Sequence, residues 1–104
     1  MNTFAIVGEI IEKPELKELN TGVKLANLMV RVKRAFPNSQ GVYEYDKFNV
    51  TLWRGIAESC NEIASVGDCV AIKGRLQSRE ITSNEGNNYI IYDIIAEHVS
   101  FLSN

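Results

Sequence analysis

The stretch DKFNVTLWR, residues 46–54, alternates like a β-strand and contains the only tryptophan of the chain. Successive side chains of a strand point to opposite faces, so this stretch has two faces of different character. The apolar face, which suits a core, consists of Phe48, Val50 and Leu52. The opposite face, which should meet solvent, consists of Lys47, Asn49, Thr51 and Trp53. A tryptophan on the solvent side needs either a cover from another element or a ligand that stacks on it.

Two more strands are predicted before this stretch. The apolar residues of the first are Phe4, Ile6 and Ile10. Gly8 is expected to be a bulge or a point of close approach, and residues 13–14 and 20–22 have the composition of turns. The apolar residues of the second strand are Ala26, Leu28, Val30 and Val32. Residues 36–41 should then form a loop.

The hydrophobic period changes after the stretch, which predicts a short helix followed by two strands. The apolar stripe of the helix consists of Ile56, Ala57, Cys60, Ile63 and Ala64. Gly67 stands where a C-terminal cap would fall. The inward residues of the last two strands are Val70, Ile72 and Leu76, followed by Ile90, Tyr92, Ile94 and Ala96. The polar segment 83–88 between these strands predicts a hairpin loop.

This order of elements predicts an all-β fold. Three strands, one helix and two strands form the order of a five-stranded OB-fold barrel, in which a short helix lies between strands 3 and 4. We expect the five strands to be antiparallel. A length of 104 residues suits a single domain, residues 1–104.

Composition excludes several classes of protein. With 45% hydrophobic and 23% charged residues the chain reads as a soluble globular domain, and no apolar run approaches the roughly 20 residues of a membrane span. No signal peptide is apparent, and Cys60 and Cys69 match no metal or redox spacing, which favours the reducing cytoplasm. His98 has no ligand or triad partner at a recognisable spacing, and no nucleotide, nucleophile or metal motif occurs. We therefore expect no enzyme activity, no metal and no cofactor.

The net charge is −2, but the charge is unevenly distributed. Residues 21–43 contain four basic side chains and no acidic one. The outward positions of the fourth strand are Lys73, Arg75, Gln77 and Arg79, again without an acid. With Arg31 and Lys33 of the second strand and with Trp53, they predict a groove in which cations follow phosphates and bases stack on aromatic rings. Such a groove binds single-stranded nucleic acid without sequence preference.

Alternatives stay open for these residues. A helix that begins near Ile56 could cover Trp53, and the outward cations could only solvate the sheet and protect its edges. Phe36, Tyr43 and Tyr45 flank the loop after the second strand. They could form a flap at the mouth of the groove, or they could pack over the core.

Short motifs recur in a specific order and spacing along nearly the whole chain. They are Asn2 with Ile6–Gly8, Pro14–Leu16, Gly22 with Ala26, Asn49 with Thr51–Arg54, Ala57–Glu58, Gly67–Asp68, Gly74–Arg79, and Ala96–Glu97 with Phe101–Leu102. In these motifs the chain resembles the bacterial single-stranded DNA-binding protein family. The resemblance implies an OB-fold and a homotetramer, although a dimer is possible. It also implies a cytoplasmic role in replication, recombination or repair.

Only part of the family's stacking residues carries over to this chain. Phe36 and Trp53 match two of four aromatic positions, whereas Lys47 and Ile81 occupy the other two. Glu9 stands where a basic residue often follows the glycine. The resemblance therefore implies weaker or altered binding, helped by Tyr45 or Tyr89.

Many family members also carry an acidic tail that recruits other proteins. Because this chain stops at Asn104, we expect no recruitment through such a tail. If 104 residues is the natural length, such a chain suits a phage, mobile-element or DNA-uptake paralogue better than a housekeeping protein, whereas an engineered truncation would look the same.

The sequence thus predicts non-enzymatic, sequence-nonspecific binding of single-stranded DNA. The expected phosphate contacts are Lys33, Arg54, Lys73, Arg75 and Arg79, with Arg31 and Lys47 beside them, and the expected stacking residues are Trp53 and Phe36, with Tyr45. An alternative, which the negative net charge favours, is an OB-fold interaction subunit that binds another protein and little DNA. RNA is a third candidate ligand, because stacking does not read the sugar.

Overall fold

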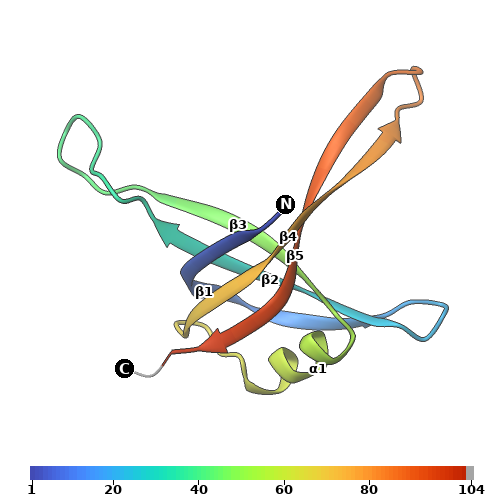
Figure 1. Ribbon diagram of the computed structural model, residues 1–104, viewed down its shortest axis with the longest axis horizontal. Helices are drawn as coiled ribbons and strands as arrows, with labels where there is room; N and C mark the ends of the chain where they lie inside the picture. Colours follow the sequence, from blue (N-terminus) through green and yellow to red (C-terminus); the bar gives the residue numbers. More distant parts are fainter. Residues whose placement is uncertain (103–104) are drawn as a thin grey trace.

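The computed structural model describes residues 1–102, which form five strands and one helix (Figure 1). The elements are β1 (Phe4–Glu18), β2 (Lys24–Lys33), β3 (Tyr45–Trp53), α1 (Arg54–Ile63), β4 (Cys69–Thr82) and β5 (Asn88–Phe101). The strands close into a barrel in the order β1-β2-β3-β5-β4. This confirms the five-stranded OB-fold with a helix between strands 3 and 4. Asn104, on which the expectation about the tail rests, lies outside the described residues.

One strand pair of the barrel is parallel. β3 and β5 run in the same direction where Val50 lies opposite Ile94 and Thr51 opposite Ile95, whereas the other four pairs of neighbours are antiparallel. The expectation that all strands are antiparallel was therefore wrong for this pair. The reason is parity, because a closed ring of five strands cannot alternate in direction at every step.

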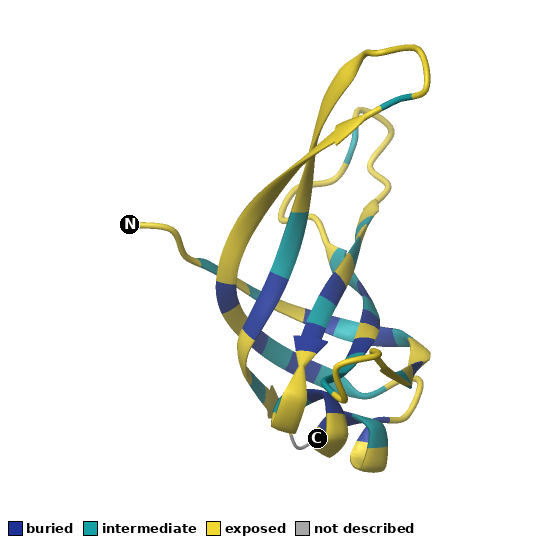
Figure 2. Cartoon of the chain, turned by 90° about the vertical axis from the view of Figure 1, so that its right-hand side faces the viewer, coloured by how far each residue is buried: buried dark blue, intermediate teal, exposed yellow. Residues whose placement is uncertain are grey.

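The core lies inside the barrel and is closed at one end by α1 (Figure 2). Five of the seven core positions predicted for β2 and β3 are fully buried, namely Ala26, Leu28, Val30, Val50 and Leu52, whereas Val32 and Phe48 are half-buried. Burying a valine or leucine side chain stabilises a fold by about 1.5–3 kcal/mol. The alternating patterns of β2 and β3 thus identified the face of these strands that packs into the core, and with it the opposite face that is directed outward.

The buried face of α1 contains fewer residues than predicted. Ala57, Cys60 and Ala64 are buried at positions i, i+3 and i+7, but Ile63 lies on the flank of this stripe and is exposed. The predicted cap at Gly67 was also wrong, because the C-cap residue is Ala64, whose N–H donates to the Cys60 carbonyl. Gly67 instead has a φ of +96° and forms the turn that leads into β4. At 10 residues, α1, the only helix among residues 1–102, is too short to cross a membrane.

β1 continues through the position where a turn was expected. Register shifts between Ile10 and Glu12 and between Glu12 and Glu15 let Pro14 remain within the strand, where it is buried. A bulge tolerates a proline because the missing N–H has no ladder partner there. The predicted close approach at Gly8 is confirmed, since a Cβ at this position would lie 2.7 Å from the carbonyl oxygen of Arg31.

The β4–β5 hairpin extends well beyond the barrel (Figures 1 and 2). Its tip at residues 83–87 forms the predicted loop, closed by the Ser83 N–H donating to the Asn87 carbonyl at 2.8 Å. The prediction that Leu76, Ile90 and Tyr92 point into the core was wrong, because all three are exposed. These residues lie on the same face of their strands as the core residues. They are exposed because no other strand of the barrel packs against this part of the hairpin.

Candidate nucleic-acid interface

One face of β2 and β3 presents a continuous row of paired side chains. Residues that lie opposite each other in antiparallel strands share a face. The pairs along this row, the β2–β3 row, are Leu25–Trp53, Asn27–Thr51, Met29–Asn49, Arg31–Lys47 and Lys33–Tyr45. The row changes along its length from an indole ring and neutral amides to cations and a phenol ring.

The β2–β3 row forms one wall of a groove, and the β4–β5 hairpin forms the other. This central groove has a volume of about 640 Å³. The row contributes Asn27, Asn49, Thr51 and Trp53 to it, and the hairpin contributes Gln77, Arg79, Tyr92 and Asp93. OB-folds bind oligonucleotides at this place, on strands 2 and 3 between the first and last hairpin loops.

A second hollow of about 460 Å³, the side hollow, adjoins the central groove at Trp53. It is also lined by Leu19 of the β1–β2 turn, by Arg54 and by Arg75. Trp53 borders both hollows with 36% of its surface exposed, although α1 begins at the next residue. The helix therefore leaves the ring accessible, and the predicted solvent-facing position of Trp53 is confirmed.

The two arginines of β4 are paired with acids of β5. Arg79 donates from Nε to Oδ2 of Asp93 at 2.6 Å and from Nη2 to Oδ1 at 3.2 Å. Arg75 donates from Nη1 to Oε2 of Glu97 at 3.4 Å. The hydrogen bonds to Asp93 raise the pKa of Arg79, which stays charged. The outward positions of β4 from Lys73 to Arg79 contain no acid, as the sequence indicates. The acids of β5 nevertheless neutralise part of their positive charge.

Lys73 lies apart from the other cations of its strand. A register shift between Lys73 and Gly74 places Lys73 opposite His98. Both side chains line a different hollow of about 350 Å³, on the outer side of β1, β4 and β5. The structure therefore does not bring Lys73 together with Arg75 and Arg79.

Arg31, Lys33 and Tyr45 gather at the basic end of the β2–β3 row, around a hollow of about 430 Å³. The Nε of Arg31 lies 2.6 Å from Oε1 of Glu9, and its guanidinium carbon lies 4.4 Å from the centre of the Tyr45 ring. The Nζ of Lys33 lies 4.2 Å from the centre of the Tyr43 ring. Each cation covers one face of a tyrosine, so only the opposite face of each ring is left for a base.

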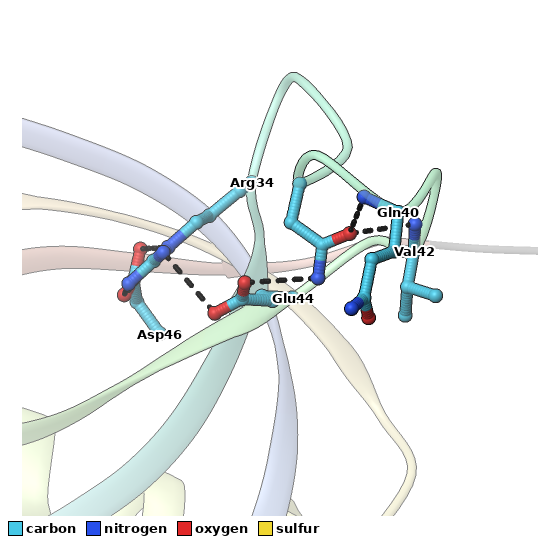
Figure 3. A network of polar contacts seen from close by, with 6 residues as sticks. Arg34, Gln40, Val42, Glu44 and Asp46 are labelled. Carbon is cyan, nitrogen blue, oxygen red and sulfur yellow. Dashed lines mark hydrogen bonds and ion pairs between the residues drawn. The ribbon is translucent and has the colours of Figure 1, made fainter.

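Phe36 lies in the loop between β2 and β3, with 82% of its surface exposed. It does not cover the core, and it lines neither hollow beside Trp53. The loop is held by Arg34, which donates to Asp46 at 2.8 Å and to Glu44 at 3.3 Å (Figure 3). The hydrogen bond from Arg34 holds the pKa of the Asp46 carboxyl below its ordinary value. A fixed loop thus presents Phe36 to solvent.

Most residues that line the central groove were missed as site residues, among them Tyr92, Asn27, Gln77 and Asp93. The alternating pattern assigned Tyr92 to the core, yet it is 68% exposed. The alternation itself does not mark where the barrel ends. β4 and β5 pair with each other as far as Thr82 and Asn88, whereas β3 pairs with β5 only at Ile94 and Ile95, so the outer part of the hairpin lies beyond the barrel.

No group of His, Cys, Asp and Glu side chains in residues 1–102 is arranged to hold a metal ion. Cys60 and Cys69 are free thiols, and burial raises the pKa of Cys60.

A closed barrel with a groove across β2 and β3 defines an OB-fold with an interface suited to an extended single strand. Residues 1–102 match the single-strand binding protein family. The chain belongs to this family, which confirms the resemblance of its motifs.

Several curated proteins are similar to the chain. The single-stranded DNA-binding protein of Halalkalibacterium halodurans is 35% identical over 98% of this chain and 61% of its own length. Single-stranded DNA-binding protein 1 of Staphylococcus aureus is 33% identical over 98% of this chain and 65% of its own length. Single-stranded DNA-binding protein B of Bacillus subtilis is 33% identical over 97% of this chain and 89% of its own length. The chain thus spans less than two thirds of the first two relatives.

Proposed function

We propose that this protein binds single-stranded DNA without sequence preference and without catalysing a reaction. The observation that carries the proposal is the accessible ring of Trp53 at the junction of two hollows, with guanidinium groups on both sides. Every base has a π-face, so stacking on such a ring is tolerant of sequence. The names of the three relatives support DNA as the ligand.

The strand is proposed to follow the β2–β3 row. Trp53 stacks on a base, while Arg54, Arg75 and Arg79 contact phosphates along the two hollows. At the basic end of the row the phosphate contacts are Arg31, Lys33 and Lys47, and the further stacking rings are Tyr45 and Phe36. Lys73 is left out of this path, because it lines a hollow on another face.

The biological setting that fits this activity is protection of single strands in replication, recombination or repair, in the cytoplasm. A homotetramer is proposed from the family resemblance. The exposed apolar side chains of Leu76 and Ile90 on the hairpin support self-association. Light scattering of the purified protein measures the assembly directly.

Fluorescence titration tests the proposed function, because Trp53 is the only tryptophan and lies where the central groove and the side hollow meet. Oligothymidylate added at low salt should quench the emission. Repeating the titration at higher salt should weaken binding, with a log–log slope of about −0.7 for each phosphate that the protein neutralises. Absence of both quenching and binding at low salt would contradict the proposal. Oligouridylate in place of oligothymidylate separates DNA from RNA preference.

A second function is favoured by the ion pairs on the hairpin. Arg75 and Arg79 already hold carboxylates, and apolar side chains are exposed nearby. Both features suit an OB-fold subunit that docks on another protein and binds DNA weakly. A normal oligomer without measurable affinity for oligothymidylate at low salt would favour this second function.

A further inference from the structure

The ion pair between Arg79 and Asp93 lies inside the central groove. The two residues come from neighbouring strands, and both line the groove beside Trp53. The contact is bidentate, with N···O distances of 2.6 and 3.2 Å, and the Asp93 side chain is only 24% exposed. Asp93 therefore occupies two of the five N–H donors of the guanidinium.

A carboxylate and a phosphate compete for the same fork of donors. Arginine binds either anion through two parallel N–H···O bonds, so a phosphate that uses this fork must displace the carboxylate or share it. The negative charge of Asp93 also repels a phosphate that enters the groove. An arginine that is already neutralised adds little to the release of counterions, which drives binding to a polyanion.

We propose that Asp93 sets the affinity of the groove for single-stranded DNA by holding Arg79 in an ion pair that an incoming phosphate must open. The inference rests on the proposed function. Arg75 and Glu97 form a weaker version of the same arrangement, because their single contact is 3.4 Å long and both side chains are about half exposed. The tighter pair is therefore the one that limits binding.

A double-mutant cycle tests this role of Asp93. The four proteins are wild type, Asp93→Asn, Arg79→Gln and the double variant, titrated with labelled oligothymidylate at several salt concentrations. Asp93→Asn should raise the affinity about two- to fivefold, the range of an exposed ion pair, and steepen the salt slope by about 0.7. Arg79→Gln should lower the affinity in both backgrounds, because it removes a proposed phosphate contact, and the loss should be larger in the Asp93→Asn background, where no carboxylate holds the guanidinium.

A matched control separates the ion pair from general charge. Glu80 follows Arg79 on the same strand but lies on the opposite face of the hairpin, because successive residues of a strand alternate. Glu80→Gln changes the net charge by the same amount and should leave the affinity unchanged. Circular dichroism and thermal unfolding check that every variant is folded.

The outcomes separate this inference from the function on which it rests. If the wild type binds but Arg79→Gln lowers affinity by the same factor in both backgrounds, Asp93 acts only as a background charge and the inference is overturned. An equal gain from Glu80→Gln would overturn it as well. If none of the four proteins binds, the proposed function fails and the inference fails with it.

Discussion

Trp53 and Arg54 form the junction at which β3 passes into α1. Trp53 is extended, with φ −115° and ψ 146°, whereas Arg54 has a φ of +55°. This left-handed conformation costs a residue with a side chain roughly 1–2 kcal/mol. The abrupt change in direction lets the helix turn over the barrel end while the indole ring stays on the groove face. Backbone strain of this kind is found at functional sites, where the surrounding structure holds it in place.

Replacing Trp53 with alanine should weaken binding without unfolding the protein, because the ring borders two open hollows. Alanine substitution in single-strand binding proteins shows that each stacked base is worth about 1–3 kcal/mol. Trp53→Phe keeps a smaller ring and should recover part of the loss. Fluorescence anisotropy of a labelled oligothymidylate measures all three proteins, since the variants lack the intrinsic signal. Equal affinities of wild type and Trp53→Ala would show that the ring does not stack.

The strands differ in how well the sequence predicted them. β2 and β3 are buried on one face along most of their length, so their alternation identified both the core and the opposite row. In β5 the same alternation continues into the part of the hairpin that extends beyond the barrel. No other element covers that part, so its apolar residues are exposed and the pattern does not predict burial there. The acids that pair with Arg75 and Arg79 could not be predicted from β4 alone, because Asp93 and Glu97 come from a neighbouring strand whose register depends on a bulge.

The β2–β3 loop provides a prediction about pH. Arg34 lowers the pKa of Asp46, so the pair stabilises the folded loop above the ordinary carboxyl pKa of 3.8. This contribution is lost as the pH falls through the lowered pKa of Asp46, because the protonated carboxyl no longer pairs with the guanidinium. The Tm difference between wild type and Asp46→Asn should therefore be present at neutral pH and vanish well below pH 3.8. A difference that persists in acid would assign the effect to packing and not to charge.

The cations of β4 lie on two different surfaces of the barrel. β4 carries Arg75 and Arg79 toward the hollows beside Trp53, whereas Lys73 faces a hollow on the outer side of β1, β4 and β5. The protein has a net charge of −2, so a general attraction to DNA is not available. The binding of DNA must instead depend on the positions of the individual lysine and arginine side chains relative to the groove.

Two substitutions of equal charge test this dependence on position. Arg54→Gln and Lys73→Gln each remove one positive charge, but Arg54 lines the side hollow next to Trp53 and Lys73 does not. Arg54→Gln should weaken binding to oligothymidylate and reduce the salt slope by about 0.7, the value for one phosphate contact. Lys73→Gln should leave both quantities unchanged. Equal losses from the two variants would mean that the strand is attracted by the field of the whole molecule, or that its path crosses the outer side of β4 as well as the groove.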